Sequence, residues 1–132
     1  MKIYLAHSRE FDYQHDLYDP IRRNSNLNQS DLIFPHEQSD SKTSQHDRQF
    51  YKDLDLVIAE VSFPATGLGI ELAWCADAKV PIVCISRRDA HVSGSLRAVC
   101  SDFYQYSDAD ELSRLVENII KHYKLGEYNV NQ

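Results

Sequence analysis

Apolar and polar positions along this chain predict short buried strands that alternate with helices. Apolar runs predict strands at residues 2–6, 31–34, 56–61 and 81–85, and a short edge strand at 103–106. Nearly unbroken apolar runs, such as the one at 56–61, are typical of parallel strands covered on both faces. We therefore expect a five-stranded parallel sheet with helices packed on both faces, which is an α/β fold of three layers.

Between these runs, apolar side chains recur at the spacing of helices. Helices are predicted at about 12–22 with a break at Pro20, at about 44–53, at about 66–78 and, more weakly, at 95–100. The clearest apolar stripe follows Ser107, the expected cap of the last helix, and Gly126 is expected to end it. The pattern predicts a single flavodoxin-like (Rossmann-like) domain over residues 1–132, with 126–132 as a frayed tail.

Composition narrows the classes of partner and compartment. The 132 residues carry a formal net charge of −6, which disfavours a nucleic-acid polymer, because affinity for phosphate backbones depends on clustered Lys and Arg. Three cysteines without a C-x-x-C motif predict free, buried thiols in a reducing, cytoplasmic compartment. No apolar run approaches the roughly 18 residues of a membrane span or forms a signal peptide, so no membrane association is expected.

The strongest chemical signal lies in residues 55–85, which read as strand, glycine-bearing turn, helix and strand. Ligands of open α/β sheets bind at the carboxyl ends of strands, and Glu71 falls there, just inside the predicted helix. With Thr66 as the helix cap, Glu71 lies in the first turn, where the helix dipole stabilises an ionised carboxylate. Glutamate is common in first turns for that reason alone, so position does not decide its role.

Other residues near this segment are candidates for the same site. Asp47 lies on the helix that precedes the strand, and two carboxylates can act as nucleophile and proton donor. From position alone, an exposed helix-surface aspartate is the more common interpretation of Asp47. Gly67 and Gly69 either let a ligand approach the backbone or supply positive φ in a tight turn. Tyr4 leaves the first strand beside the expected crevice.

No metal and no cofactor are expected. His36 and Glu37 lack a second histidine at the spacing of a zinc site. The glycines at 67 and 69 lack the third glycine and the acidic ribose contact of a dinucleotide fingerprint. A Ser-His-Asp triad is not supported, because the chain has no G-x-S-x-G elbow.

The run AEVSFPATGLGIELAWCADAKVPIVCI, at residues 59–85, resembles the nucleoside 2-deoxyribosyltransferase superfamily. The resemblance is to its branch of 2'-deoxynucleoside 5'-monophosphate N-glycosidases in particular. Those proteins carry a strand ending in A-E-V, a proline, G-x-G-x-E, a helix and a K-P-I strand. The corresponding positions here are 59–61, Pro64, 67–71 and 80–82, with Lys79 shifted by one. The resemblance covers about residues 2–122 and is strongest over 47–85.

The resemblance implies roles for individual residues. Glu71 would attack the anomeric carbon of a (deoxy)ribosyl group, Asp47 would help the base to leave, and Tyr4 would orient Glu71. Substrate contacts would come from His7, Ser8, Arg9, Ala65, Thr66, Gly67, Gly69 and Ser93. Ser93, in SGSLRAV, corresponds to the serine that the family lends to the neighbouring subunit, which implies a homodimer.

Two positions depart from the family pattern. Ala65 stands where the monophosphate hydrolases have a phosphate-binding serine and many transferases an aspartate, and His7 replaces a small glycine. These departures leave the requirement for a 5'-phosphate open, whereas Glu71, Asp47 and Tyr4 fit the pattern. The expected function is cleavage of the N-glycosidic bond of a small-molecule nucleoside or nucleotide. The alternatives are a base-exchanging deoxyribosyltransferase, a nucleotide-sensing domain without turnover, and an NAD-cleaving hydrolase of the TIR type.

Overall fold

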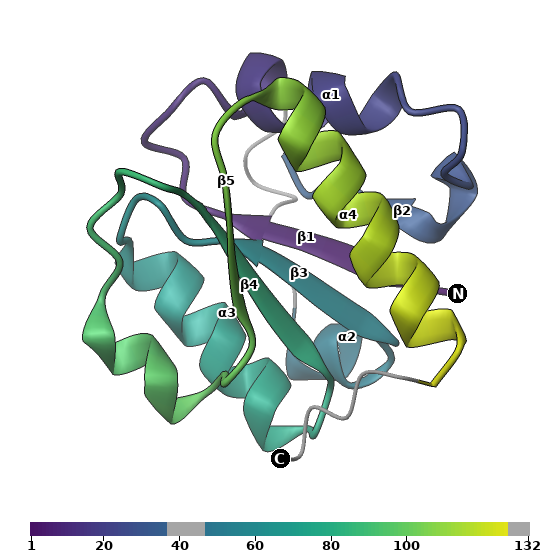
Figure 1. The fold of residues 1–132 in the computed structure, drawn as a ribbon. Coiled ribbons are helices and arrows are strands. Elements are labelled where there is room, and N and C mark those ends of the chain that lie inside the picture. Colours follow the sequence, from purple (N-terminus) through teal and green to yellow (C-terminus); the bar gives the residue numbers. More distant parts are fainter. Residues whose placement is uncertain (37–46, 127–132) are drawn as a thin grey trace.

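Five strands form one parallel sheet in the computed structural model, which describes residues 1–36 and 47–126. The strands are β1 (Ile3–His7), β2 (Leu32–Ile33), β3 (Leu56–Glu60), β4 (Ile82–Arg87) and β5 (Phe103–Tyr106). Their order is β2-β1-β3-β4-β5 (Figure 1), and all neighbouring pairs are parallel. This is the flavodoxin-like order, so the predicted fold class is confirmed. Predictions for residues 37–46 and 127–132 lie outside the described residues.

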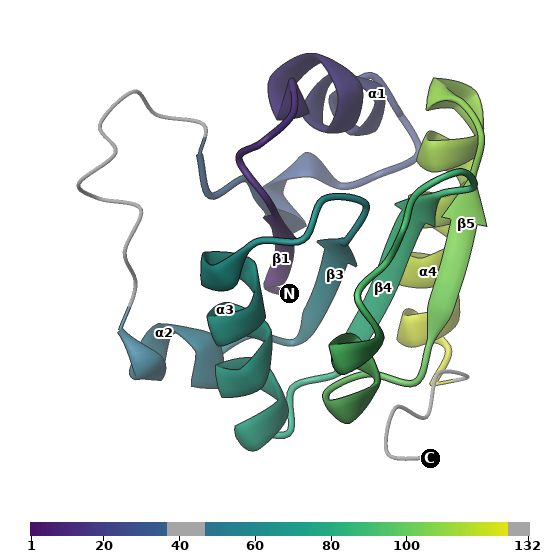
Figure 2. The ribbon, with the colours of Figure 1, turned by 90° about the vertical axis from the view of Figure 1, so that its left-hand side faces the viewer.

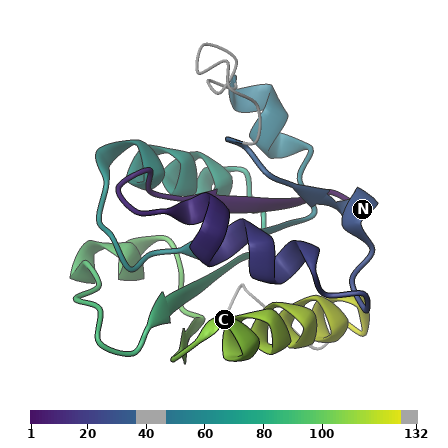
Figure 3. The same ribbon diagram turned by 90° about the horizontal axis from the view of Figure 1, so that it is seen from above.

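Helices cover both faces of the sheet. They are α1 (Asp19–Arg22), α2 (Arg48–Lys52), α3 (Thr66–Asp77) and α4 (Ala109–Lys124). Figure 2 shows α2 and α3 on one side of the sheet and α4 on the other, and Figure 3 shows α1 on the side of α4. Within residues 1–36 and 47–126, no helix is long and apolar enough to cross a membrane.

Alternation along β1 shows how one strand serves both layers. Ile3 and Leu5 join the buried cluster under α1 and α4, whereas Tyr4 and Ala6 join the cluster under α2 and α3. All four side chains are at most 1% exposed, as expected for the central strand of a doubly covered sheet. Tyr4 is thereby directed toward α3, which carries Glu71.

The ends of the last helix differ from the prediction at one position. Asp108, not Ser107, caps α4, because its backbone is extended and its carboxylate accepts a hydrogen bond from the Glu111 N–H at 2.8 Å. The Glu111 carboxylate accepts from the Ser107 N–H at 2.6 Å, so Ser107 lies one residue before the cap. Gly126, with φ of 73°, follows the helix as predicted and adopts the left-handed conformation that glycine tolerates.

Two further helices have different local geometry from the prediction. The segment before Pro20 is a π-helical turn, Gln14–Tyr18, and Pro20 lies in the first turn of α1. A proline in a first turn removes an N–H that has no partner within the helix, so the position is compatible with its ring. The weak helix predicted at 95–100 is a 3-10 helix at Gly94–Ala98.

A buried polar network joins the carboxyl ends of β3, β4 and β5. Glu60 is 1% exposed. Its carboxylate accepts hydrogen bonds from the Ser62 N–H at 2.7 Å, from the Ser62 hydroxyl at 2.8 Å and from the Tyr106 hydroxyl. The Ser62 oxygen in turn accepts from the Arg87 N–H at 2.8 Å. Burial, followed by the nearby Glu60, raises the pKa of Tyr106, which keeps this hydroxyl a donor.

Replacing Glu60 by alanine is expected to destabilise the protein by about 3 kcal/mol, because it leaves buried donors of Ser62 and Tyr106 without an acceptor. Urea denaturation followed by circular dichroism measures the loss. Glu117→Ala is the matched control, since the Glu117 carboxylate accepts from Asn24 and Asn26 at the surface of α4. A loss for Glu60→Ala no larger than for the control would show that the network adds little stability.

Candidate active site

Glu71 lies in the second turn of α3, not in the first. The helix begins at Thr66, after Ala65, whose backbone is extended (φ −151°, ψ 141°), and no acidic residue occupies the first turn. The predicted cap at Thr66 is therefore wrong, because the residue with the extended backbone that a cap requires is Ala65. The helix dipole acts mainly within the first turn, so it does not account for a carboxylate at Glu71.

Two tyrosine hydroxyls hold the Glu71 carboxylate instead. Tyr4 from β1 donates to Oε2 at 2.5 Å, and Tyr51 from α2 donates to the same oxygen at 2.7 Å. The expected hydrogen bond between Tyr4 and Glu71 is thus present. Both tyrosines are at most 2% exposed, and their rings pack edge to face at 5.8 Å, so packing fixes the direction of both donors.

The hydrogen bonds from Tyr4 and Tyr51 engage only one of the two oxygens of the Glu71 carboxylate. Burial, followed by the Glu71 carboxylate, raises the pKa of both Tyr4 and Tyr51 well above the usual value for tyrosine. Both phenols therefore remain protonated donors over the physiological pH range. The second oxygen, Oε1, accepts no hydrogen bond from the described residues. One oxygen of Glu71 is therefore anchored by two donors, whereas the other has no donor in the part of the chain that the structure describes.

Glu71 lines a cleft of about 570 Å³ at the carboxyl ends of β1 and β3. This is the β1/β3 switch point of the strand order, where ligands of such sheets bind. The predicted residues that line the cleft together with Glu71 are His7, Ser8, Arg9, Ala65 and Gly67. The residues predicted from the sequence therefore lie on two sides of the cleft, in the loop after β1 and along α3.

A second cavity, of about 440 Å³, adjoins this cleft at the start of α3. It is lined by Thr66, Gly69 and Ser93, and it shares Glu10, Ala65 and Leu68 with the cleft. Ser93 therefore lies beside the cleft of its own chain, and its predicted role in a neighbouring subunit stays a prediction.

The two glycines of the motif lie inside α3, at its second and fourth positions. Neither has positive φ, so the interpretation of Gly67 and Gly69 as residues of a tight left-handed turn is wrong. A Cβ built on either one meets no atom within 4 Å. The space in front of them is therefore open, as close approach of a ligand to the helix requires.

Asp47 has a structural role that the sequence did not specify. It is the N-cap of α2, and its carboxylate accepts a hydrogen bond from the Phe50 N–H at 3.0 Å. It is exposed and is not among the residues that line the Glu71 cleft. Asp47 stands just before α2, with an extended backbone (ψ 172°), and Tyr51 follows it four residues later inside the helix.

His7 is buried and neutral. Its Nδ1 donates to the Ser8 carbonyl oxygen at 2.7 Å, which makes Nε2 the acceptor for the Tyr18 hydroxyl at 2.6 Å. The residue is 3% exposed, and burial lowers the pKa of His7 to about 4. The imidazole therefore adds no positive charge to the cleft at neutral pH. Its bulk, at a position where the resembling family has glycine, packs against Tyr18 and His36.

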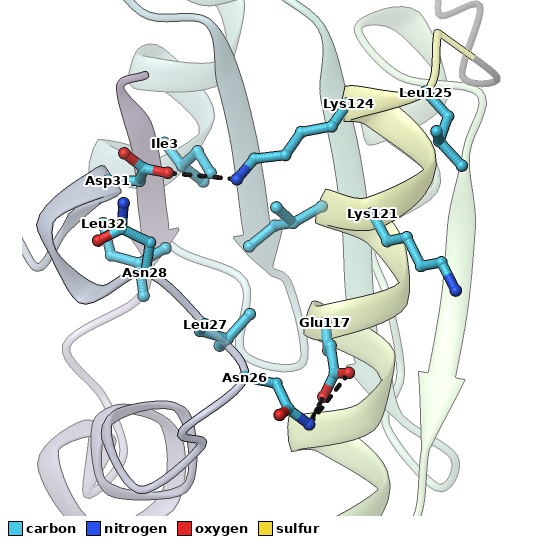
Figure 4. A pocket seen from close by; sticks show the side chains of 11 residues that line it. Ile3, Asn26, Leu27, Asn28, Asp31, Leu32, Glu117, Lys121, Lys124 and Leu125 are labelled. Atoms are coloured by element: carbon cyan, nitrogen blue, oxygen red, sulfur yellow. Dashed lines mark hydrogen bonds and ion pairs between the residues drawn. The ribbon is translucent and has the colours of Figure 1, made fainter.

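A different cavity, of about 310 Å³, lies at the opposite end of the sheet. Figure 4 shows it between the start of β1 at Ile3, the start of β2 at Leu32 and the last turn of α4. Lys124 approaches Asp31 across its mouth at 3.4 Å. Because ligands of parallel α/β sheets bind at the carboxyl ends of the strands, we do not assign a function to this cavity.

Comparison with known proteins adds a family context to this geometry. No protein-family profile matches the chain. It is 31% identical to a protein of Methanococcoides burtonii over 58 residues, which is 44% of this chain and 48% of the relative. It is 26% identical to a protein of Thermofilum pendens over 81 residues, which is 58% of this chain and 57% of the relative. Both carry the provisional name 2'-deoxynucleoside 5'-phosphate N-hydrolase 1.

The chain is similar to nucleotide N-hydrolases. It spans about half the length of the curated relatives it matches. Among solved structures, it is similar to the CMP N-glycosidase BcmB of Clostridium botulinum, with a TM-score of 0.59 and 20% identity over 88% of this chain and 99% of that one. At this identity the likeness concerns the fold. The resemblance seen in the sequence is confirmed by these similarities.

Six residues of the cleft were not among the candidates from the sequence, and two of them, Leu68 and Ile70, are apolar side chains of α3. Tyr51 and Trp74 follow the apolar spacing of α2 and α3, which is typical of packing residues. His36 was considered only as a metal ligand, yet it lines the cleft, and its N–H donates to the Tyr18 hydroxyl at 3.1 Å. Glu10 lies in the polar turn after β1, where no pattern distinguishes it. In the described part of the chain, no group of three or more His, Cys, Asp or Glu side chains could hold a metal ion.

Proposed function

We propose that this chain cleaves the N-glycosidic bond of a nucleoside or nucleotide, with Glu71 as the nucleophile. The observation that carries the proposal is the Glu71 carboxylate, anchored through Oε2 by two buried tyrosine hydroxyls in a cleft at the sheet's switch point. A nucleophilic carboxylate must be held in place with one oxygen free, and this arrangement meets both conditions. The N-hydrolase and N-glycosidase names of the similar proteins support the same reaction class.

The proposed reaction has two steps. In the first, Oε1 of Glu71 bonds to the anomeric carbon while the bond from that carbon to the base nitrogen breaks, and its electron pair leaves with the base, which takes up a proton. In the second, water adds to the same carbon and gives one proton back to the group that protonated the base, while the ester bond to Glu71 breaks and the carboxylate is regenerated. In both transition states the sugar has the positive charge of an oxocarbenium ion, and the negative charge of the Glu71 carboxylate stabilises it.

For the proton of the first step we propose Asp47 as the donor. The resemblance supports this role, and Asp47 stands at the start of α2, the helix whose Tyr51 hydroxyl contacts Glu71. Two further points belong to the same proposal: a cytoplasmic compartment, which rests on the free cysteines, and a homodimer in which Ser93 completes a neighbouring site, which rests on the resemblance.

A panel of nucleosides and 5'-monophosphates, followed by chromatography for free base, tests the proposal. Base release without an added acceptor base is expected, as hydrolysis requires. Base exchange only when an acceptor is supplied would assign a transferase instead. Binding without any product would leave a sensing domain. Nicotinamide release from NAD, with no release from nucleosides, would indicate a TIR-type activity.

Replacing Tyr4 by phenylalanine is expected to lower the rate of base release about 10- to 100-fold, because a hydrogen bond to a charged carboxylate is lost. The ring and its edge contact with Phe50 at 5.6 Å remain, so the fold should be preserved. Steady-state kinetics of base release measure the effect. Tyr123→Phe on α4 is the matched control, and equal rates in the two variants would contradict the anchoring role of Tyr4.

A further inference from the structure

We infer that Glu10 makes this cleft selective for nucleosides that lack a 5'-phosphate; the inference rests on the proposed function and specifies its substrate class. Glu10 is the only residue with a charged side chain that lines both the Glu71 cleft and the adjoining cavity, among the residues that the structure describes there. Its N–H donates to the Ser8 hydroxyl oxygen at 3.0 Å, and Ser8 is 2% exposed. The loop that carries Glu10 is thereby tied to the end of β1.

The direction of α3 determines how a nucleoside lies in the cleft. Ala65 and Gly67 line the cleft at the start of the helix, Glu71 lies in its middle, and Trp74 lies one turn further on. Trp74 offers an aromatic surface, which suits stacking of a nucleobase. With the anomeric carbon at Glu71 and the base toward Trp74, the opposite end of the sugar, which carries the 5' group, points toward Ala65 and Glu10.

The charges at that end do not suit a phosphate. The charged side chains that line the cleft are Arg9, Glu10 and Glu71, which are one cation and two carboxylates, and Arg9 does not line the adjoining cavity. His7 is neutral, since burial lowers its pKa to about 4. Ala65 offers no hydroxyl at the start of α3. A phosphate monoester carries about −1.5 to −2 charges at neutral pH and would be repelled by the Glu10 carboxylate.

Apart from Arg9, the arginines that could neutralise a phosphate near the sheet's carboxyl edge line a different cavity. Arg23, Arg87 and Arg88 line a separate cavity at the ends of β4 and β5. The first N–H groups of α3 have no side-chain cap, and such groups favour an anion. Glu10 lines the adjoining cavity at the start of α3, so the chain already places a negative charge beside these N–H groups. A free 5'-hydroxyl can donate a hydrogen bond to this carboxylate, so Glu10 favours the nucleoside and disfavours the nucleotide.

This substrate class differs from the one in the names of the similar proteins, which specify a 5'-phosphate or CMP. The test compares kcat/KM for each nucleoside of a panel with that for its own 5'-monophosphate. We expect the wild type to prefer the nucleoside by about tenfold or more, from charge repulsion alone. Glu10→Gln should reduce this preference, and Glu10→Arg should reverse it and make inorganic phosphate a competitive inhibitor. Asp77→Arg, at the exposed end of α3, is the control for the same change in net charge.

Two results would overturn the inference: a wild-type preference for monophosphates, or a preference unchanged by Glu10→Arg. Failure of the proposed function is distinguishable, because it would appear as no base release from any substrate. In that case, calorimetric titration of wild type and Glu10→Arg with a nucleoside and its monophosphate still decides the point. Tighter binding of the nucleoside by the wild type supports the role of Glu10, and tighter binding of the monophosphate rejects it.

Discussion

Replacing Glu71 by glutamine is expected to reduce base release by about 10⁴-fold or more, the scale of loss when an enzyme's nucleophile is removed. An amide oxygen is too weak a nucleophile to form the glycosyl ester, although it still accepts hydrogen bonds from Tyr4 and Tyr51. Glutamine also keeps the size of the side chain, so α3 should fold as before. The effect is therefore chemical, and a thermal denaturation curve close to that of the wild type should accompany it.

Two measurements check this prediction. Chromatography quantifies free base, and intact-protein mass spectrometry of a quenched reaction detects the sugar adduct on wild-type protein and its absence from Glu71→Gln. Glu117→Gln on α4 makes the same chemical change away from the cleft and should keep full activity. A wild-type rate from Glu71→Gln would reject the assignment of the nucleophile.

Replacing Asp47 by asparagine is expected to slow base release by about 10²- to 10⁴-fold, the usual contribution of a general acid. Asparagine caps helices as well as aspartate does, so α2 should keep its first hydrogen bond, from Phe50 N–H to residue 47. The loss should be largest for bases that leave poorly and smallest for a base that is already cationic. A purely structural role of Asp47 would not produce that dependence on the leaving group.

Asp53→Asn, at the other end of α2, is the matched control. Its carboxylate accepts a hydrogen bond from Gln49 at the surface and does not line the cleft, so its activity should equal that of the wild type. If Asp47→Asn behaves like this control with every substrate, Asp47 is only a helix cap and another group protonates the base.

The strands could be predicted from the sequence because each one is encoded by its own apolar run. All five observed strands begin or end within two residues of the predicted limits. The cap residues of α3 and α4 were harder to predict. Two neighbouring residues could cap each helix, Ala65 or Thr66 for α3 and Ser107 or Asp108 for α4, and the backbone of the preceding loop determines which one does. At both boundaries the observed cap, Ala65 or Asp108, has an extended backbone.

The site was predictable only where a motif marked it. Two segments carry the resemblance, one around Glu71 and one in the first loop with His7 and Ser8, and each of them is a continuous stretch of sequence. The contact between Tyr51 and Glu71 joins residues 20 positions apart, and no local pattern distinguishes this tyrosine from a packing residue. Glu10 has the same property, because its importance depends on where two cavities meet. Such residues are defined by tertiary structure, which a single sequence does not reveal.

The short helix α2 is a region of low local stability beside Glu71. A five-residue helix is not stable in isolation, so α2 stays in place through the packing of Phe50 and Tyr51 against the sheet. If this helix detaches, Glu71 loses one of its two anchors while the sheet and α4 remain intact. Loss of activity in mild denaturant would then precede unfolding of the core, and the catalytic lifetime of the protein would be set by this one short helix.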